Sequence, residues 1–153
     1  MLDFRSIANK KLEDIERPKN APIGDYLWQI TKVPAIETLP GDAWDVVDFQ
    51  LKCVAPVAVD ADSLQEWGGD VSKVRLRHRF MFSKTDPVEQ EKSIWRLRDF
   101  MENHVKTATP DMTLTEAMNS TVNGQFIGGI TWQQDKKDES IFHMNIGKTA
   151  PVA

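Results

Sequence analysis

The chain has 153 residues and a formal net charge of -4, with 41% hydrophobic and 27% charged residues. This composition is typical of one globular domain that is long enough to bury a core, and no apolar run reaches the roughly 18 residues that cross a bilayer. The single Cys53 excludes an internal disulfide, and the first six residues lack a signal-peptide pattern, so we expect a reducing cytoplasm.

The chain is predicted to divide into an N-terminal arm, residues 1–20, and a single domain, residues 21–153. The arm is mixed in charge and is expected to form either a short amphipathic helix or a wrapping segment. Its apolar residues are spaced loosely: Phe4, Ile7, Leu12 and Ile15. Alternation of apolar and polar residues then predicts strands over residues 25–33 and 44–54, with a Pro- and Gly-containing loop between them.

The segment over residues 73–82 is the most informative strand in the sequence. Its residues alternate strictly, so one face carries cations and the other is largely apolar. The cationic face holds Lys73, Arg75, Arg77 and Arg79, and the other face holds Val74, Leu76, His78, Phe80 and Phe82. Because aligned cations repel one another, we expect an anionic partner, with a nucleic-acid backbone as the first candidate. The alternative is a solvated face that is answered by acidic neighbours.

The second half of the chain predicts two helices and then two strands. Asp86-Pro87 has the pattern of a helix start, with Asp86 as N-cap and Glu89 completing a capping box. A second capping box, Thr113 to Glu116, opens a short helix that ends near residue 119. Strands follow over residues 124–133 and 141–146, joined by a polar hairpin loop, and Gly128-Gly129 predicts a bulge.

The order strand, strand, strand, helix, strand, strand is that of the OB-fold, a five-stranded, partly open antiparallel barrel. We therefore predict a mainly β, OB-like barrel with a helix between strands three and four and an N-terminal arm. A small mixed sheet with a covering helix has the same order of elements.

The sequence contains none of the patterns that catalysis requires. It has no phosphate-binding glycine loop and no His-Glu-x-x-His motif. The three histidines are scattered, and His78 lies on the apolar side of its strand, where a core residue is expected. We predict no enzymatic activity, no catalytic residue, no cofactor and no metal.

Binding of a single strand needs a cationic groove together with aromatic rings on which bases stack. The sequence offers Trp44 on the outer face of the second strand, next to Lys52. Trp28 and Tyr26 on the first strand either line the core or stack with bases, and the hairpin loop adds Lys136 and Lys137. Of the remaining tryptophans, Trp95 and Trp132 are expected in the core, whereas Trp67 either covers the end of the barrel or contacts a ligand.

Four short segments carry a family resemblance within residues 21–147. They are Pro22-Ile-Gly-Asp-Tyr26, Leu114-Thr-Glu-Ala-Met118, Val122-Asn-Gly-Gln-Phe126 and Phe142-His-Met-Asn-Ile146. In these the chain resembles the small OB-fold single-stranded-DNA-binding proteins of bacteriophages. The resemblance implies that the protein coats and protects exposed single strands during DNA replication or recombination, without sequence preference. The end, residues 148–153, is not the acidic partner-binding tail of bacterial relatives, and residues 55–72 have no clear counterpart.

These observations predict a protein whose partner is single-stranded DNA, in the cytoplasm of the host cell if it is viral. Contacts with other replication proteins and a homo-oligomer are further partners that the sequence leaves open, and no membrane is expected. Two alternatives remain. One is a protein-interaction or structural module of a phage-like assembly, whose arm swaps into a neighbour. The other is a binder of single-stranded RNA, because contacts to the 2′-hydroxyl leave no motif.

Overall fold

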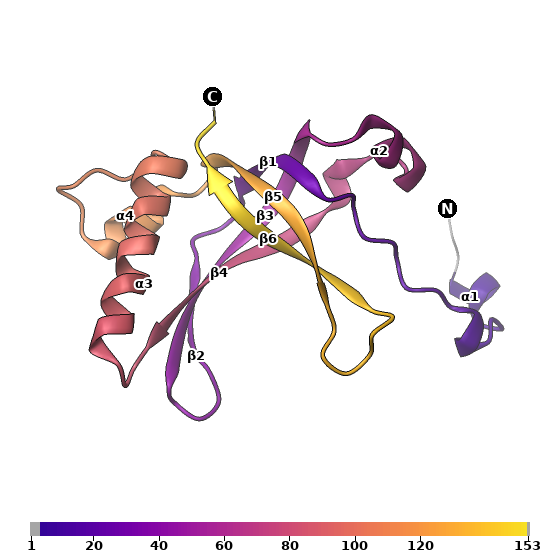
Figure 1. The fold of residues 1–153 in the computed structure, drawn as a ribbon, viewed down its shortest axis with the longest axis horizontal. Helices are drawn as coiled ribbons and strands as arrows, with labels where there is room; N and C mark the ends of the chain where they lie inside the picture. The colour runs from indigo at the N-terminus through magenta and orange to yellow at the C-terminus, as the bar shows by residue number, and fades with distance from the viewer. Residues whose placement is uncertain (1–3, 153) are drawn as a thin grey trace.

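The computed structural model describes residues 4–152 and shows a mainly β protein built on one antiparallel sheet of six strands (Figure 1). The strands are β1 (Gly24–Ile30), β2 (Ala35–Thr38), β3 (Trp44–Ala58), β4 (Arg75–Ser83), β5 (Gln125–Gln134) and β6 (Phe142–Ala150). Their order is β2-β3-β1-β5-β6, with β4 on the other edge of β3, so the sheet is not closed. The mainly β prediction is therefore confirmed.

The long strand β3 holds the sheet together because it has partners on both edges. Along one edge its first half pairs with β2 and its second half with β1, for example Ala35 with Asp48 and Ile30 with Leu51. The whole of β4 lies along the other edge. The prediction of a loop over residues 34–42 was wrong in part, because residues 35–38 form β2. Pro34 lacks an N–H and interrupts the first strand, but the chain resumes pairing with β3 directly after it.

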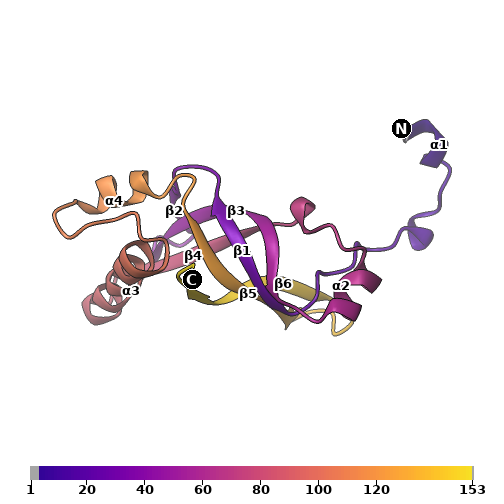
Figure 2. The same ribbon diagram turned by 90° about the horizontal axis from the view of Figure 1, so that it is seen from above.

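The helices lie at the two ends of the sheet (Figures 1 and 2). At one end are α3 (Pro87–Asp99), which continues into a π-helical turn over residues 100–104, and α4 (Leu114–Ser120). At the other are α2 (Ala61–Trp67) and the N-terminal segment with α1 (Phe4–Ile7). Short 3-10 turns cover residues 12–14 and 71–73. No helix among residues 4–152 is both long and apolar enough to span a membrane.

Both predicted helix starts are confirmed by their caps. The Asp86 carboxylate accepts hydrogen bonds from the backbone N–H groups of Val88 at 3.0 Å and Glu89 at 3.3 Å. The Thr113 hydroxyl accepts one from the N–H of Glu116 at 3.2 Å. Each cap satisfies N–H groups that the first turn of a helix leaves without a partner.

Phe100 joins the helical end to the sheet. Its ring centre lies 5.1 Å from that of Phe49 on β3 and 4.9 Å from that of Phe126 on β5, both edge to face. The ring of His78, from the inner face of β4, lies 5.0 Å from Phe100. This apolar setting lowers the pKa of His78 from 6.5 to about 4, chiefly through desolvation and then through nearby His104. The predicted placement of His78 on the apolar side is confirmed.

Tyr26 and Trp28 are both 0% exposed, so neither can stack with a base. The Tyr26 hydroxyl donates to the Pro22 carbonyl at 2.7 Å, and the Trp28 indole N–H donates to the Gly128 carbonyl at 2.9 Å. Gly128 permits this approach, because a Cβ there would lie 3.2 Å from atoms of both Phe126 and Trp28. The pairing of β5 with β6 shifts register between Gly128 and Ile130, which confirms the predicted bulge.

Two tryptophans that were expected in the core are exposed instead, Trp95 by 62% and Trp132 by 43%, and Phe142 is also exposed, by 41%. Trp95 lies off the buried stripe of α3, with the Arg98 guanidinium 5.2 Å from its ring centre. Pairing of β5 with β1 ends at Ile130, so the hairpin that carries Trp132 and Phe142 extends beyond the part of β5 that pairs with β1.

Candidate nucleic-acid interface

The pairing of β3 with β4 places the cations of β4 on one face with defined neighbours. Residues directly opposite each other in antiparallel strands share a face. The pairs on the outer face are Lys52 with Arg75, Gln50 with Arg77, Asp48 with Arg79, Val46 with Met81, and Trp44 with Ser83. Arg75, Arg77 and Arg79 are all exposed, as the alternation predicted, whereas Lys73 precedes the strand in a 3-10 turn and is exposed there.

Arg79 is neutralised by an acidic neighbour that the sequence analysis did not assign to it. Its Nε lies 2.8 Å from one carboxylate oxygen of Asp48, and its terminal NH2 lies 3.1 Å from the other. Asp48 is only 5% exposed, since Ala35 of β2 lies opposite it on the far side. The hydrogen bond that Arg79 donates to the Asp48 carboxylate raises the pKa of Arg79. A bidentate pair of this kind holds the guanidinium in place, neutralises its charge and uses two of its five N–H donors.

At the other end of the same face, no carboxylate within residues 4–152 pairs with Lys52, Arg75 or Arg77. One terminal nitrogen of Arg75 donates to the backbone carbonyls of Ser72 at 2.6 Å and Val74 at 3.2 Å. The side chains of Arg77 and Lys52 make no hydrogen bond or ion pair with any part of the chain that the structure describes. Their donors face solvent, and an anion can reach them.

An open depression of about 570 Å³ lies at this end. It is lined by three cations together with polar and apolar residues: Thr31, Lys32, Gln50, Leu51, Arg75, Leu76 and Arg77. We call Lys32, Lys52, Arg75 and Arg77 the open basic surface. Sequence analysis missed Lys32, because a strand continuing to residue 33 would have placed it with the inward residues. β1 ends at Ile30, so that alternation does not reach Lys32.

Trp44 is 40% exposed at the far end of the outer face, as predicted. Six residues separate it from Gln50, which is about 20 Å along a strand. Val46 on the same face is 1% exposed, because Met81 lies opposite it on one side and Glu37 on the other. Trp44 has only the small Ser83 opposite it on β4, so its ring stays accessible.

Lys136 and Lys137 lie in the β5–β6 hairpin loop, outside the depression. Both are exposed, but Asp135 organises the loop around itself by accepting backbone hydrogen bonds from Lys137 at 2.8 Å and Asp138 at 3.1 Å. A hydrogen bond from His143, followed by these backbone bonds, lowers the pKa of Asp135 to about 2. The acids of the loop therefore offset its two lysines, and the loop is not a strong cationic patch.

The groups that could carry chemistry are dispersed or buried. Burial raises the pKa of the Cys53 thiol to about 11, so it stays protonated at neutral pH. Within residues 4–152, no three side chains of His, Cys, Asp or Glu come together in a way that could hold a metal ion.

Comparison of the sequence with models of protein families gave no match, and comparison with curated proteins gave no significant match. A functional conclusion for this chain therefore rests on the outer face of β3 and β4 and on the residues around it.

Proposed function

We propose that the protein binds single-stranded DNA through the open basic surface. The observation that carries this proposal is the gathering of Lys32, Arg75 and Arg77 around one depression, with no carboxylate paired to them among residues 4–152. Phosphates would bind to these cations, and each neutralised phosphate releases counterions and so makes the affinity depend on salt.

The depression suits a single strand because unpaired bases leave their edges accessible. The Gln50 amide on its lining offers hydrogen bonds to those edges. A duplex keeps its bases stacked inside and would gain only the phosphate contacts. Trp44, further along the same face, would stack another base of a longer strand, for about 1–3 kcal/mol per base.

We also propose that the sheet is an OB-like barrel that has not closed. β1 and β2 together would take the place of the first OB strand, interrupted at residues 31–34, and β3 and β4 would be the second and third. α3 follows the third, and β5 and β6 complete the set. OB-folds bind oligonucleotides across their second and third strands, which correspond here to the two strands that carry the open basic surface. In a cell, such a protein would protect strands exposed during DNA replication or recombination.

Titration of a labelled dT oligonucleotide, read by anisotropy at low and moderate salt, tests the proposal. We expect tight binding that weakens as salt rises, and much weaker binding to a duplex of equal length. A parallel titration with an oligo-U strand decides between DNA and RNA. Equal affinity for duplex and single strand would contradict the single-strand proposal, and so would absence of binding at low salt.

The N-terminal arm supports a second candidate, a protein-interaction module. Phe4 is 76% exposed and Leu12 is 87% exposed, although both are large and apolar, and this segment leads away from the sheet (Figure 1). Light scattering of wild type and a Phe4→Ser, Leu12→Ser variant tests this candidate. An oligomer that depends on both side chains and persists in excess oligonucleotide would favour the interaction module.

A further inference from the structure

A second cavity, of about 640 Å³, lies between the N-terminal segment, α2 and the β5–β6 hairpin, and shares no lining residue with the depression on β3 and β4. Its walls include three aromatic rings, which belong to Trp67 at the end of α2, Trp132 on β5 and Phe142 on β6. We call this cavity the aromatic pocket. Its volume lies within the range of about 300–1,000 Å³ that is usual for ligand sites.

The two indoles of the aromatic pocket are fixed by their N–H groups. Trp132 donates to the carbonyl of Ala21 at 2.8 Å, and Trp67 donates to the carbonyl of Lys19 at 3.1 Å. Their polar atoms are therefore satisfied within the protein, and Trp132 is nevertheless 43% exposed. What these side chains offer to a ligand is the flat face of the ring.

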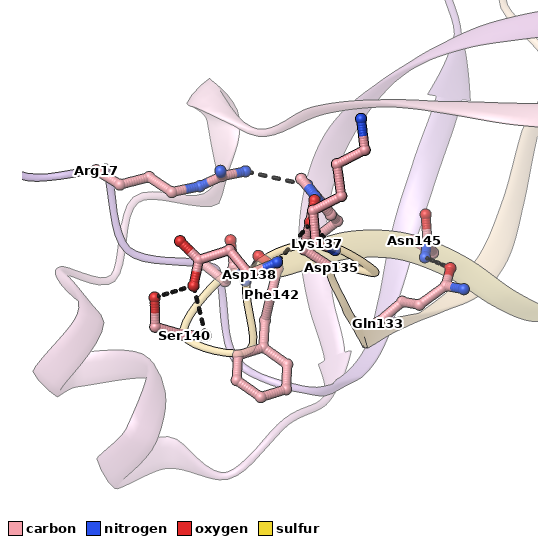
Figure 3. Close-up of polar contacts among 10 residues, drawn as sticks. Arg17, Gln133, Asp135, Lys137, Asp138, Ser140, Phe142 and Asn145 are labelled. Atoms are coloured by element: carbon pink, nitrogen blue, oxygen red, sulfur yellow. Dashed lines mark hydrogen bonds and ion pairs between the residues drawn. The ribbon is translucent and has the colours of Figure 1, made fainter.

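The N-terminal wall of the pocket is bonded to the hairpin. The Asn20 amide donates to the carbonyl of Phe142 at 2.7 Å, and a terminal nitrogen of Arg17 lies 3.1 Å from Nδ1 of His143. In Figure 3, Arg17 points from the N-terminal segment toward the hairpin, and the Phe142 ring stands clear of the hairpin's polar contacts. The walls are thus positioned before a ligand arrives, which lowers the entropic cost of binding.

We propose that the aromatic pocket binds a nucleobase of the strand whose phosphates the open basic surface holds. This inference rests on the proposed function. Flat rings at fixed positions favour stacking with a planar base, and Arg17 and Lys19 on the pocket lining suit the phosphate attached to it. Glu66, also on the lining, offers an acceptor to a base amino group.

The pocket is continuous along the chain with the open basic surface. α2, which ends at Trp67, leads through the 3-10 turn of residues 71–73 into β4, which begins at Arg75. Figures 1 and 2 both place α2 and the start of β4 toward the end of the molecule that carries the N-terminal segment. A strand that runs along β4 toward Arg75 therefore approaches the pocket.

The test compares a dT oligonucleotide with an abasic strand of equal length, because the abasic strand keeps the phosphates and lacks the bases. Wild type should bind the dT strand more tightly by at least a factor on the order of ten, because the abasic strand loses the base stacked in the pocket and any base stacked on Trp44. Phe142→Ala should reduce that ratio severalfold and leave the affinity for the abasic strand unchanged. Trp95→Ala, which removes an exposed ring on α3, is the matched control and should change neither value.

The outcomes separate this inference from the proposed function. If wild type binds neither strand, the proposed function fails, and this inference fails with it. If wild type binds both strands but Phe142→Ala keeps the wild-type ratio, the phosphate contacts stand and the pocket assignment is overturned.

A second readout covers the case in which Phe142→Ala fails to fold. In wild type, the indole N–H resonances of Trp67 and Trp132 should shift on addition of the dT strand and stay in place with the abasic strand. Unshifted resonances with both strands would contradict a nucleobase and would point instead to an apolar side chain of a protein partner.

Discussion

The two ends of the outer face of β4 carry the same residue type in opposite electrostatic settings. Arg79 is held by both oxygens of a nearly buried carboxylate, at 2.8 and 3.1 Å. Arg77, two residues earlier on the same face, lies opposite the neutral Gln50 and lines an open depression. The residue across the strand pair therefore decides whether an arginine stabilises the fold or is free to bind an anion.

The largest effect on binding should come from removing the two arginines of the open basic surface. Arg75→Ala with Arg77→Ala should weaken dT binding at low salt by on the order of 100-fold, since each hydrogen-bonded charge contributes about 1.5 kcal/mol or more. Anisotropy titration measures this loss, and thermal unfolding should show little change in stability, because neither side chain is paired with a carboxylate. An affinity within threefold of wild type would show that the strand binds elsewhere.

Protonation of His78, on the inner face of β4, should lower the stability of the fold without changing the arginines on the outer face. Its pKa is about 4 in the folded protein and 6.5 ordinarily, so the unfolded chain takes up the proton first as pH falls. The stability from neutral His78 is present above pH 6.5 and is lost as pH falls toward 4, with about 2 kcal/mol lost at pH 5.

Chemical denaturation of wild type and His78→Leu at pH 7.5 and 5 measures the effect. The variant should lose less stability than wild type between the two pH values. An equal loss in wild type and His78→Leu would assign the acid sensitivity to other groups.

The Arg79 end should respond in stability and not in binding. Arg79→Ala leaves the Asp48 carboxylate, which is 5% exposed, without its partner, and should cost about 1–2 kcal/mol of folding free energy. Affinity for the dT strand should stay within about twofold, because the Asp48 carboxylate already neutralises the charge of Arg79. A loss of affinity as large as that of the open-end variant would remove the distinction between the two ends.

The smallest effect should come from removing the carboxylate charge that pairs with Arg79. Asp48→Asn keeps the shape of the side chain and removes its charge, so Arg79 becomes able to bind a phosphate. We expect an affinity for the dT strand about threefold higher and a salt dependence steeper by about 0.7 in slope, as for one added contact to a single strand. Unchanged affinity and slope would mean that no phosphate passes Arg79.

Much of the fold follows from patterns within single elements. Alternation identified the buried face of β3 through Val47, Phe49 and Leu51, and capping residues placed the starts of α3 and α4. β2 escaped notice because it has four residues, all exposed, and no buried face to produce a pattern.

The candidate site was harder to predict because it depends on contacts between elements. Alternation showed that Arg75, Arg77 and Arg79 share a face, but only the register of β3 against β4 shows that Asp48 meets Arg79. Lys32 joins the surface because β1 ends at Ile30, so the alternation of the strand does not reach Lys32. Trp132 and Phe142 have the spacing of core residues. They are exposed because their hairpin extends beyond Ile130, where the pairing of β5 with β1 ends.

The most direct test of this account is the salt dependence of dT binding by Arg77→Ala and Arg79→Ala, two single variants of one residue type on one strand. The account predicts that Arg77→Ala lowers the slope of log affinity against log salt by about 0.7, whereas Arg79→Ala keeps the wild-type slope. Equal slopes for the two variants would contradict the assignment of single-strand binding to the open basic surface.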